Sequence, residues 1–241
     1  MIDLEDLHIN GLKIYQDAGG FRFGTDSVLL ARFACQKKAG RVCDLCSGCG
    51  IVGLLVSAFC RAEDICCVEI APAQALLAER SAALNGLGDR MRVLCADIRD
   101  VKNLFAHGSF DLVTANPPYH KVGSGKLSSK AAGARSEQTC SVDDVTAAAG
   151  HLLHTGGRLC LVHRADRVAD VLCSARAAGL EPKRLRFVCS KPGREPYLLL
   201  CEAVKGARAG MRVDSPLFIM DERGEYTAQF RAVLGPELCG E

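Results

Sequence analysis

Short apolar runs alternate with helix-like segments from residue 41 onward, and this alternation is the strongest constraint on the fold. The runs predicted to be strands are 41–45, 65–69, 91–95, 110–114, 158–162, 185–189 and 198–203. The segments predicted to be helices are 51–60, 73–85, 142–153 and 166–178. Repeated strand–helix units favour a parallel sheet with helices on both faces. The sequence therefore predicts an α/β fold.

The last two predicted strands depart from this pattern. A loop rich in proline and glycine, residues 190–196, joins them where a helix would be needed to keep them parallel. We therefore expect a seven-stranded, mostly parallel sheet with an antiparallel last strand. Residues 1–40 are predicted to be a cap or lid region packed on the main domain, 41–241. Within that domain, residues 205–241 are expected to be a tail.

Composition excludes several classes of protein. Hydrophobic residues make up 49% of the chain and charged residues 24%, which excludes a mainly disordered chain. The longest apolar stretch, 51–60, is too short to span a bilayer, and the first ten residues lack the apolar core of a secretion signal. We expect a cytoplasmic protein that does not bind membranes and assume a monomer.

Fourteen cysteines are too few for a disulfide scaffold in a chain of 241 residues. Many stand where alanine or valine would fit, so we interpret them as small buried hydrophobes. Cys43, Cys46 and Cys49 have the spacing of a metal or iron–sulfur site, but no second cysteine or histidine pair follows at the spacing of a zinc site. No metal is predicted.

Acidic residues and a glycine turn follow successive predicted strands. Asp44 opens a turn that contains Gly48 and Gly50, and a turn of this kind lets the backbone approach a nucleotide-like ligand. The acidic residue suits a cofactor that carries an ammonium group. Glu69 ends the next strand and is placed to accept hydrogen bonds from ribose hydroxyls, and Asp97 follows the third, where it can meet an adenine amino group.

The most specific motif is Asn-Pro-Pro-Tyr at 116–119, directly after the fourth predicted strand. The prolines stiffen the backbone and leave the Pro117 carbonyl free to accept a hydrogen bond. Together with the Asn116 side-chain oxygen it can hold both hydrogens of a planar amino group. The Tyr119 ring offers a face on which a planar substrate stacks. This pattern predicts methyl transfer to an amino group.

These motifs occur with FRFGTDSVLL at residues 21–30. The whole set resembles the bacterial valine-tRNA adenine-37 N6-methyltransferase family over nearly the full chain. The resemblance implies a Rossmann-like class I methyltransferase fold and S-adenosylmethionine as cofactor. It also implies N6-methylation of adenine in a tRNA.

The resemblance assigns roles to individual residues. The adenine pocket would be formed by Asn116, Pro117 and Tyr119. The cofactor would be held by Thr25, Asp26, Asp44, Cys46, Gly48, Gly50, Glu69, Asp97 and Asn116, with the first two in an N-terminal lid. Cys46 stands where the family usually has glycine, so we expect an ordinary backbone conformation there and weaker cofactor binding.

Basic residues are concentrated in one part of the chain. Residues 121–212 contain 16 Lys and Arg against 8 Asp and Glu, whereas the whole chain has 30 against 28. This asymmetry favours a polyanionic partner. The residues proposed to contact RNA phosphates are Lys121, Lys126, Lys130, Arg135, Lys183, Arg184, Arg186, Lys191 and Arg194.

Other functions fit the same motif. Glutamine methyltransferases that modify release factors share the Asn-Pro-Pro-Tyr pattern, but they usually carry a separate N-terminal helical domain, for which the residues before Asp44 are too few. Enzymes that methylate guanine in ribosomal RNA or adenine in DNA are further alternatives. A non-catalytic RNA-binding module with the same fold is the alternative of a different class.

Overall fold

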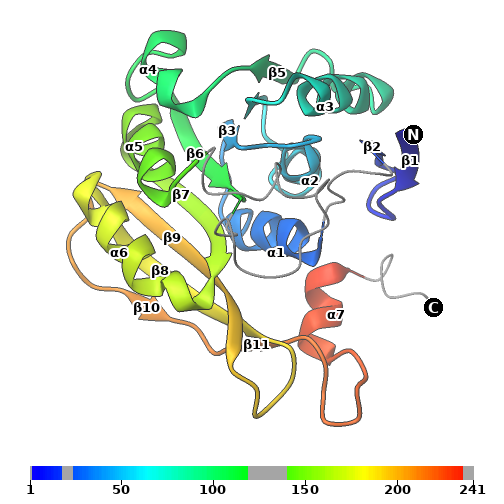
Figure 1. Cartoon of the computed structure of the whole chain (residues 1–241), viewed down its shortest axis with the longest axis vertical. Coiled ribbons are helices and arrows are strands. Elements are labelled where there is room, and N and C mark those ends of the chain that lie inside the picture. The colour runs from blue at the N-terminus through cyan, green and yellow to red at the C-terminus, as the bar shows by residue number, and fades with distance from the viewer. Residues whose placement is uncertain (1, 18–23, 119–139, 236–241) are drawn as a thin grey trace.

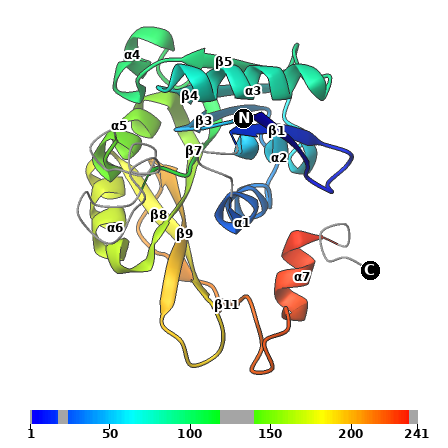
Figure 2. The same ribbon diagram turned by 45° about the vertical axis from the view of Figure 1, so that its right-hand side comes forward.

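A twisted sheet with helices on both faces forms the body of the protein (Figures 1 and 2). The computed structural model describes residues 2–17, 24–118 and 140–235. The main strands are β3 (Arg41–Leu45), β4 (Asp64–Glu69), β5 (Met91–Cys95), β6 (Phe110–Ala115), β7 (Leu153–Arg164), β8 (Leu180–Cys189) and β9 (Pro196–Lys205). Each contains one of the runs that the sequence predicted to be a strand, and the α/β fold is confirmed.

The order of the strands reverses at the centre of the sheet, and at such a reversal in an α/β sheet the loops diverge and form a crevice. The strands lie in the order β10-β8-β9-β7-β6-β3-β4-β5, in which β10 is the short strand Arg212–Val213. Strand β9 runs antiparallel to its neighbours β7 and β8. The predicted antiparallel last strand of the seven is therefore confirmed. From β3 the chain first builds outward to β4 and β5 and then returns to the other side of β3 as β6. Ligands bind at such a reversal, outside the carboxyl ends of the strands.

In the described part of the chain the sheet has nine strands, two more than the predicted seven. Two short strands, β10 (Arg212–Val213) and β11 (Leu217–Phe218), pair in parallel with β8. They belong to the segment that we expected to be a tail, which also contains α7 (Ala228–Leu234). Leu217 and Phe230 are almost fully buried. Two isolated apolar anchors in a polar segment lack the periodicity that would have revealed them in the sequence.

Helices cover the two faces of the sheet in separate groups, as predicted. One face packs against α1 (Thr25–Ala34), α2 (Ile51–Phe59) and α3 (Pro72–Leu84), and the other against α4 (Val101–Leu104), α5 (Val142–Leu152) and α6 (Val168–Ala177). Figure 1 shows α1 and α2 on one side of the strands and α5 and α6 on the other. Short 3₁₀ turns precede α4 and α6, at Ile98–Asp100 and Ala165–Arg167.

The predicted cap region, residues 1–40, is made of two unlike parts. A hairpin of β1 (Ile2–Asp6) and β2 (Lys13–Asp17) docks on α3, where the backbone N–H groups of Lys13 and Tyr15 donate to Asn85 and Ser81. Helix α1 instead belongs to the main hydrophobic core. A disulfide between Cys35 and Cys60 joins the ends of α1 and α2, a pairing that the sequence did not predict. Neither cysteine has a neighbour in sequence that marks the pairing.

Candidate active site

Three polar side chains from three strands meet at the central crevice. Asp44 is the penultimate residue of β3, Glu69 ends β4, and Asn116 follows β6. Successive side chains alternate between the faces of a sheet, and Asp44 pairs with Thr114 on one side and with Cys67 on the other. Asp44, Asn116 and Glu69 therefore point to the face covered by α1 and α2, whereas Leu45 and Ala115 point to the opposite face. The structure therefore brings the predicted strand-end residues of β3, β4 and β6 to one face of one edge.

Asp44 is a buried carboxylate. It is 1% exposed, and its Oδ1 accepts a hydrogen bond from the Thr114 hydroxyl at 2.7 Å. Burial raises the pKa of Asp44 to about 7, against the opposing effects of the Thr114 hydroxyl and the nearby Gly53 N–H. Its Oδ2 is buried and has no hydrogen-bond partner among the described residues. A buried carboxylate oxygen without a donor is costly, so this atom is set to receive a donor from a ligand.

The glycine turn is held by the carboxylate of the neighbouring strand. Glu69 Oε2 accepts from the Gly48 N–H at 2.8 Å and Oε1 from the Ala71 N–H at 2.9 Å. Each oxygen keeps a second lone pair, so Glu69 can shape the turn and still accept from a ligand. A Cβ at Gly48, which has a φ of 56°, would meet nothing within 4 Å, whereas one at Gly50 would lie 2.9 Å from the Ala78 Cβ. The first glycine borders open space, and the second allows α2 to approach α3.

The backbone conformation of Cys46 differs from the one that the sequence predicted. Its φ is 56°, in the left-handed region, where we expected an ordinary backbone conformation. The conformation is strained for a residue with a Cβ and explains why glycine suits this position. The Cys46 Sγ lies 3.6 Å from the Sγ of Cys140, just before α5, and this thiol together with burial raises the pKa of Cys46. Cys140 was not predicted from the sequence, since 94 residues separate the two.

Asp97 lies at the carboxyl end of β5, but it already has partners. Its carboxylate accepts from the side chain of Arg99 through both oxygens and caps the following 3₁₀ turn through the Arg99 N–H. These hydrogen bonds hold the pKa of the carboxyl below its usual value. Asp97 is nevertheless partly exposed, with 20% of its side chain accessible, so its outer lone pairs remain open to a ligand.

Asn116 is positioned by the first turn of α1. Its Nδ2 donates to the hydroxyl of Ser27 at 3.1 Å, and Ser27 is fully buried. The predicted cofactor residues Thr25 and Asp26 begin the same helix, so they lie next to this contact. Pro117 is buried beside Asn116, and Tyr119 lies outside the described residues. The role of Ser27 was missed from the sequence, because a serine in an apolar helix carries no functional pattern of its own.

The predicted RNA-contact residues fall into different environments. Lys191 and Arg194 are exposed in the loop of the β8–β9 hairpin, which projects from the sheet in both ribbon views (Figures 1 and 2). Lys183 donates to the carbonyls of Arg208 and Gly210. Lys121, Lys126, Lys130 and Arg135 lie outside the described residues.

Two arginines of that set are engaged with the protein. Arg184 is 8% exposed, its Nε donates to Asp214 at 2.5 Å, and its guanidinium lies 4.2 Å from the centre of the Phe33 ring. It is therefore not available to a phosphate, which corrects that prediction. Arg186 donates to the carbonyl of Ser215, and partial burial lowers its pKa.

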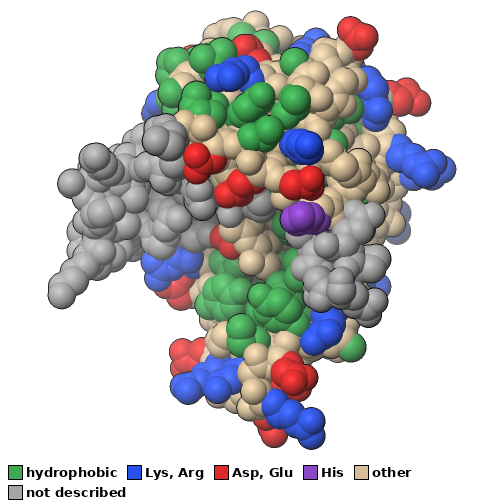
Figure 3. Space-filling model, turned by 90° about the vertical axis from the view of Figure 1, so that its right-hand side faces the viewer, with side chains coloured by type: hydrophobic (Ala, Val, Ile, Leu, Met, Phe, Trp, Pro, Cys, Tyr) green, Lys and Arg blue, Asp and Glu red, His purple; other side chains and the backbone are tan. Residues whose placement is uncertain are grey.

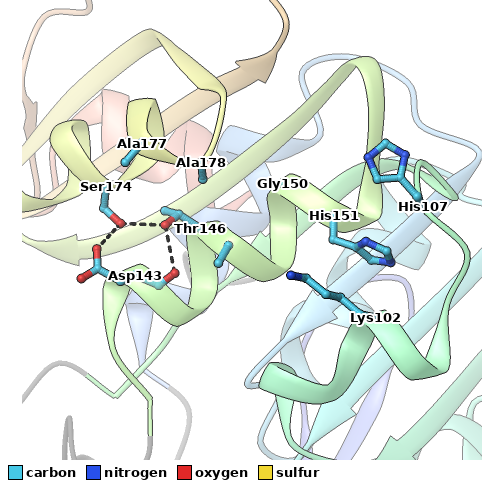
Figure 4. A pocket seen from close by; sticks show the side chains of 10 residues that line it. Lys102, His107, Asp143, Thr146, Gly150, His151, Ser174, Ala177 and Ala178 are labelled. Atoms are coloured by element: carbon cyan, nitrogen blue, oxygen red, sulfur yellow. Dashed lines mark hydrogen bonds between the residues drawn. The ribbon is translucent and has the colours of Figure 1, made fainter.

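The surface grooves formed by described residues include one beside α1 and one beside α5. One, of about 320 Å³, is beside Gly24 and Thr25 and is lined mainly by apolar residues: Leu7, Ile9, Val28, Ile51, Leu55, Tyr226 and Leu234. Figure 3 faces this side of the molecule and shows hydrophobic side chains gathered between groups of charged ones. The other groove, of about 480 Å³, lies between α5 and α6 (Figure 4).

The groove of Figure 4 contains none of the predicted site residues. Its hydroxyl groups bind one another: Ser174 donates to Asp143 at 2.5 Å and lies 2.6 Å from the Thr146 hydroxyl. Their hydrogen bonds join α5 to α6, so they hold the helix pair together.

Within the described ranges no group of three or more His, Cys, Asp or Glu is arranged to bind a metal ion. The same ranges contain no helix with the length and apolar character needed to traverse a bilayer.

Comparisons with known proteins agree with this geometry. Residues 18–174 match the methyltransferase small domain family. A tRNA1(Val) (adenine(37)-N6)-methyltransferase from Porphyromonas gingivalis is 31% identical over 195 residues, which cover 78% of this chain and 76% of the relative. A protein of the same name from Dickeya chrysanthemi is 27% identical, with 91% and 88% covered.

Solved structures share the fold. A protein from Agrobacterium tumefaciens described as a predicted O-methyltransferase has a TM-score of 0.72 at 24% identity, with 90% of this chain and 98% of that chain covered. TrmN from Thermus thermophilus has a TM-score of 0.52 at 22% identity, with 74% and 48% covered. Both likenesses show the class I methyltransferase fold.

The left-handed conformation of Cys46 generates a prediction about stability. Cys46→Gly removes the Cβ and should give a protein about 0.5–1 kcal/mol more stable than Cys46→Ala, which keeps the strain. Both variants lack the thiol, so the comparison isolates the backbone effect. The free energy of unfolding is measured by urea denaturation followed by circular dichroism. Equal stabilities for the two variants would show that the turn is relaxed.

Proposed function

Since the chain belongs to the methyltransferase small domain family and to the tRNA1(Val) (adenine(37)-N6)-methyltransferase family, we propose that it methylates N6 of adenine 37 in a valine tRNA. The methyl donor is S-adenosylmethionine. The observation that carries the proposal is the amide of Asn116, held by Ser27 at the crevice between β3 and β6 beside the Pro117 carbonyl. We further propose that it works as a monomer in the cytoplasm.

The polar groups of the crevice suit S-adenosylmethionine. Asp44 offers a buried carboxylate oxygen without a donor, which fits the ammonium of the methionine part. Ser47 adds a buried hydroxyl without a partner in the described structure, and Gly48 leaves open space where a side chain would stand. Glu69 keeps lone pairs for the ribose hydroxyls. When bound, the cofactor supplies a methyl group on a positively charged sulfur.

Asn116 and Pro117 prepare the nucleophile. The Asn116 Oδ1 and the Pro117 carbonyl accept the two hydrogens of the adenine amino group and hold it in place. Drawing the hydrogens aside weakens the conjugation of the nitrogen lone pair with the ring, so the lone pair becomes available to attack. The nitrogen loses a proton only after it has gained the methyl group, so the site needs no strong base. Adenine must leave its stack to reach this pocket.

The pKa of Asp44 makes cofactor binding dependent on pH. Its pKa of about 7 means that the carboxylate needed by an ammonium becomes protonated as the pH falls below 7. We expect the dissociation constant of S-adenosylmethionine to rise between pH 7.5 and pH 6, approaching tenfold per pH unit. Isothermal titration calorimetry measures this directly.

Two variants serve as controls for that titration. Asp44→Asn should bind more weakly at every pH and show a flat profile, because its side chain does not titrate in this range. Asp89→Asn, at an exposed position, should keep the profile of the wild type. A flat profile in the wild type would contradict the assignment of Asp44 to the ammonium.

The reaction itself is tested by substitution of Asn116. Asn116→Ala should lower the rate of methyl transfer to total tRNA at least about 100-fold, the usual effect of removing a hydrogen-bonding group that acts in the transition state. Transfer is followed with tritiated S-adenosylmethionine, and nucleoside mass spectrometry of the digested RNA identifies N6-methyladenosine.

The alternatives give different results in the same assay. Label in a release factor and not in tRNA would indicate glutamine methylation with the same pocket. No label in either substrate, with no measurable cofactor binding, would indicate an RNA-binding module. Valine tRNA transcripts with adenine 37 replaced by guanine test the position of the methyl group.

The hairpin loop carries exposed cations at this end of the sheet. Cys189 and Pro196 pair at the base of the loop, at the carboxyl ends of the parallel strands where the crevice lies. Lys191 and Arg194 are exposed there, and we propose that they contact tRNA phosphates. Lys183 lies toward the other end of β8 and holds a turn, so we assign it no such contact.

The double variant Lys191→Glu/Arg194→Glu should raise the KM for tRNA about tenfold and leave kcat nearly unchanged, because two phosphate contacts are lost. The dependence of KM on salt should also become shallower. The matched control is Lys102→Glu on α4, beside β5 at the opposite edge of the sheet. Equal KM values for the double variant and the control would exclude the hairpin loop as an RNA contact.

A further inference from the structure

The side-chain amide of Asn116 has two orientations, which differ by a half turn and exchange its oxygen and nitrogen. Only one of them directs Oδ1 toward an amino group that must be held by its hydrogens. The other presents two N–H donors to that amino group and repels it. The sequence of the motif does not choose between them, so the choice depends on what lies behind the amide.

Ser27 is the group behind it. The Ser27 hydroxyl accepts from the Asn116 Nδ2 at 3.1 Å, across 89 residues of sequence. Ser27 is 0% exposed, so water cannot replace this contact. Its place in the first turn of α1 is set by the helix, since the Ser27 N–H donates to the carbonyl of the N-cap residue Gly24 at 3.2 Å.

A serine within a helix commonly donates its hydroxyl hydrogen to a carbonyl of the preceding turn. In this protein Ser57 donates to Leu54 at 2.7 Å and Ser81 donates to Leu77 at 2.7 Å. A hydroxyl whose hydrogen is used in this way presents lone pairs to its other neighbours. The Ser27 hydroxyl accepts from the Asn116 Nδ2. A fixed orientation of the amide requires that the Ser27 hydrogen is directed away from it, so that the oxygen of a flipped amide would face lone pairs.

We propose that Ser27 is a positioning residue for methyl transfer, which fixes the Asn116 amide with its oxygen toward the substrate amino group. The inference rests on the proposed function only in requiring that a planar amino group is the acceptor. It holds equally for adenine and for a glutamine amide. Ser27 does not touch the substrate, and it acts through the orientation of Asn116.

A positioning role of Ser27 and a mere packing role predict different results when Asn116 is replaced by aspartate. An aspartate at position 116 has two equivalent oxygens, so a half turn of its side chain changes nothing. Ser27→Ala should therefore reduce kcat about 3- to 10-fold in the native background, the effect of one neutral hydrogen bond. In the Asn116→Asp background the same substitution should change the rate less than about twofold.

The wild type, Ser27→Ala, Asn116→Asp and the variant with both substitutions form a double-mutant cycle. Their rates are compared in single-turnover methyl transfer to total tRNA, which detects slow variants. Ser27→Thr keeps the hydroxyl and should retain at least about half of the wild-type kcat, whereas Ser27→Ala should not. Ser57→Ala removes a buried helical hydroxyl on α2 and should leave kcat unchanged. Thermal unfolding of every variant reports folding separately from rate.

Failure of the proposed function and failure of the positioning role of Ser27 give different results. A wild type that labels neither tRNA nor a release factor contradicts the proposed function. An active wild type with an equal loss from Ser27→Ala in both backgrounds overturns the positioning role. If Asn116→Asp transfers no methyl group even in a single turnover, the test uses the Ser27 variants with Asn116 intact. Equal rates of methyl transfer for Ser27→Ala and Ser27→Thr overturn the positioning role. A rate close to that of the wild type for Ser27→Thr, but not for Ser27→Ala, supports it.

Discussion

The parallel pairing of β3 with β6 is the interaction on which the rest of the site depends. It sets Asp44 beside Thr114, and it brings the segment after β6 to the edge where the glycine turn begins. Because the chain has already built β4 and β5 on the other side of β3, the loops after β3 and β6 diverge and leave a crevice between them. A change in that register by one residue would turn Asp44 and Thr114 to opposite faces.

The crevice contains a polar side chain whose burial costs free energy and a strained backbone conformation. Asp44 is removed from water with one oxygen unpaired, and Cys46 occupies the left-handed region beside it. Glu69 fixes the glycine turn through the N–H of Gly48 and accepts from the N–H of Ala71 at the start of α3. Strain and unpaired polar atoms persist where a surrounding scaffold holds them, and they are typical of binding sites.

Helix α1 links the N-terminal segment to the chemistry. Ser27 reaches Asn116, while the same helix packs in the core against α2 and the sheet. Charged side chains on the face of the sheet covered by α1 pair with one another. Glu202 accepts from Lys37 and lies near Arg158, and Arg184 pairs with Asp214. Among the described basic residues of this half, Arg158 and Arg184 hold the fold, whereas Lys191 and Arg194 are exposed in the hairpin loop.

The sequence by itself determined the seven main strands, the antiparallel hairpin and the positions of Asp44, Glu69 and Asn116, because periodicity and strand-end placement are local properties. It did not reveal the contact of Ser27 with Asn116, the burial of Arg184, the left-handed Cys46 or the pairing of β10 and β11 with β8. All of these except the conformation of Cys46 depend on contacts between segments that are separate in the chain. Only the tertiary structure decided them, since a hydrogen bond or an ion pair between distant residues leaves no spacing that a sequence can display.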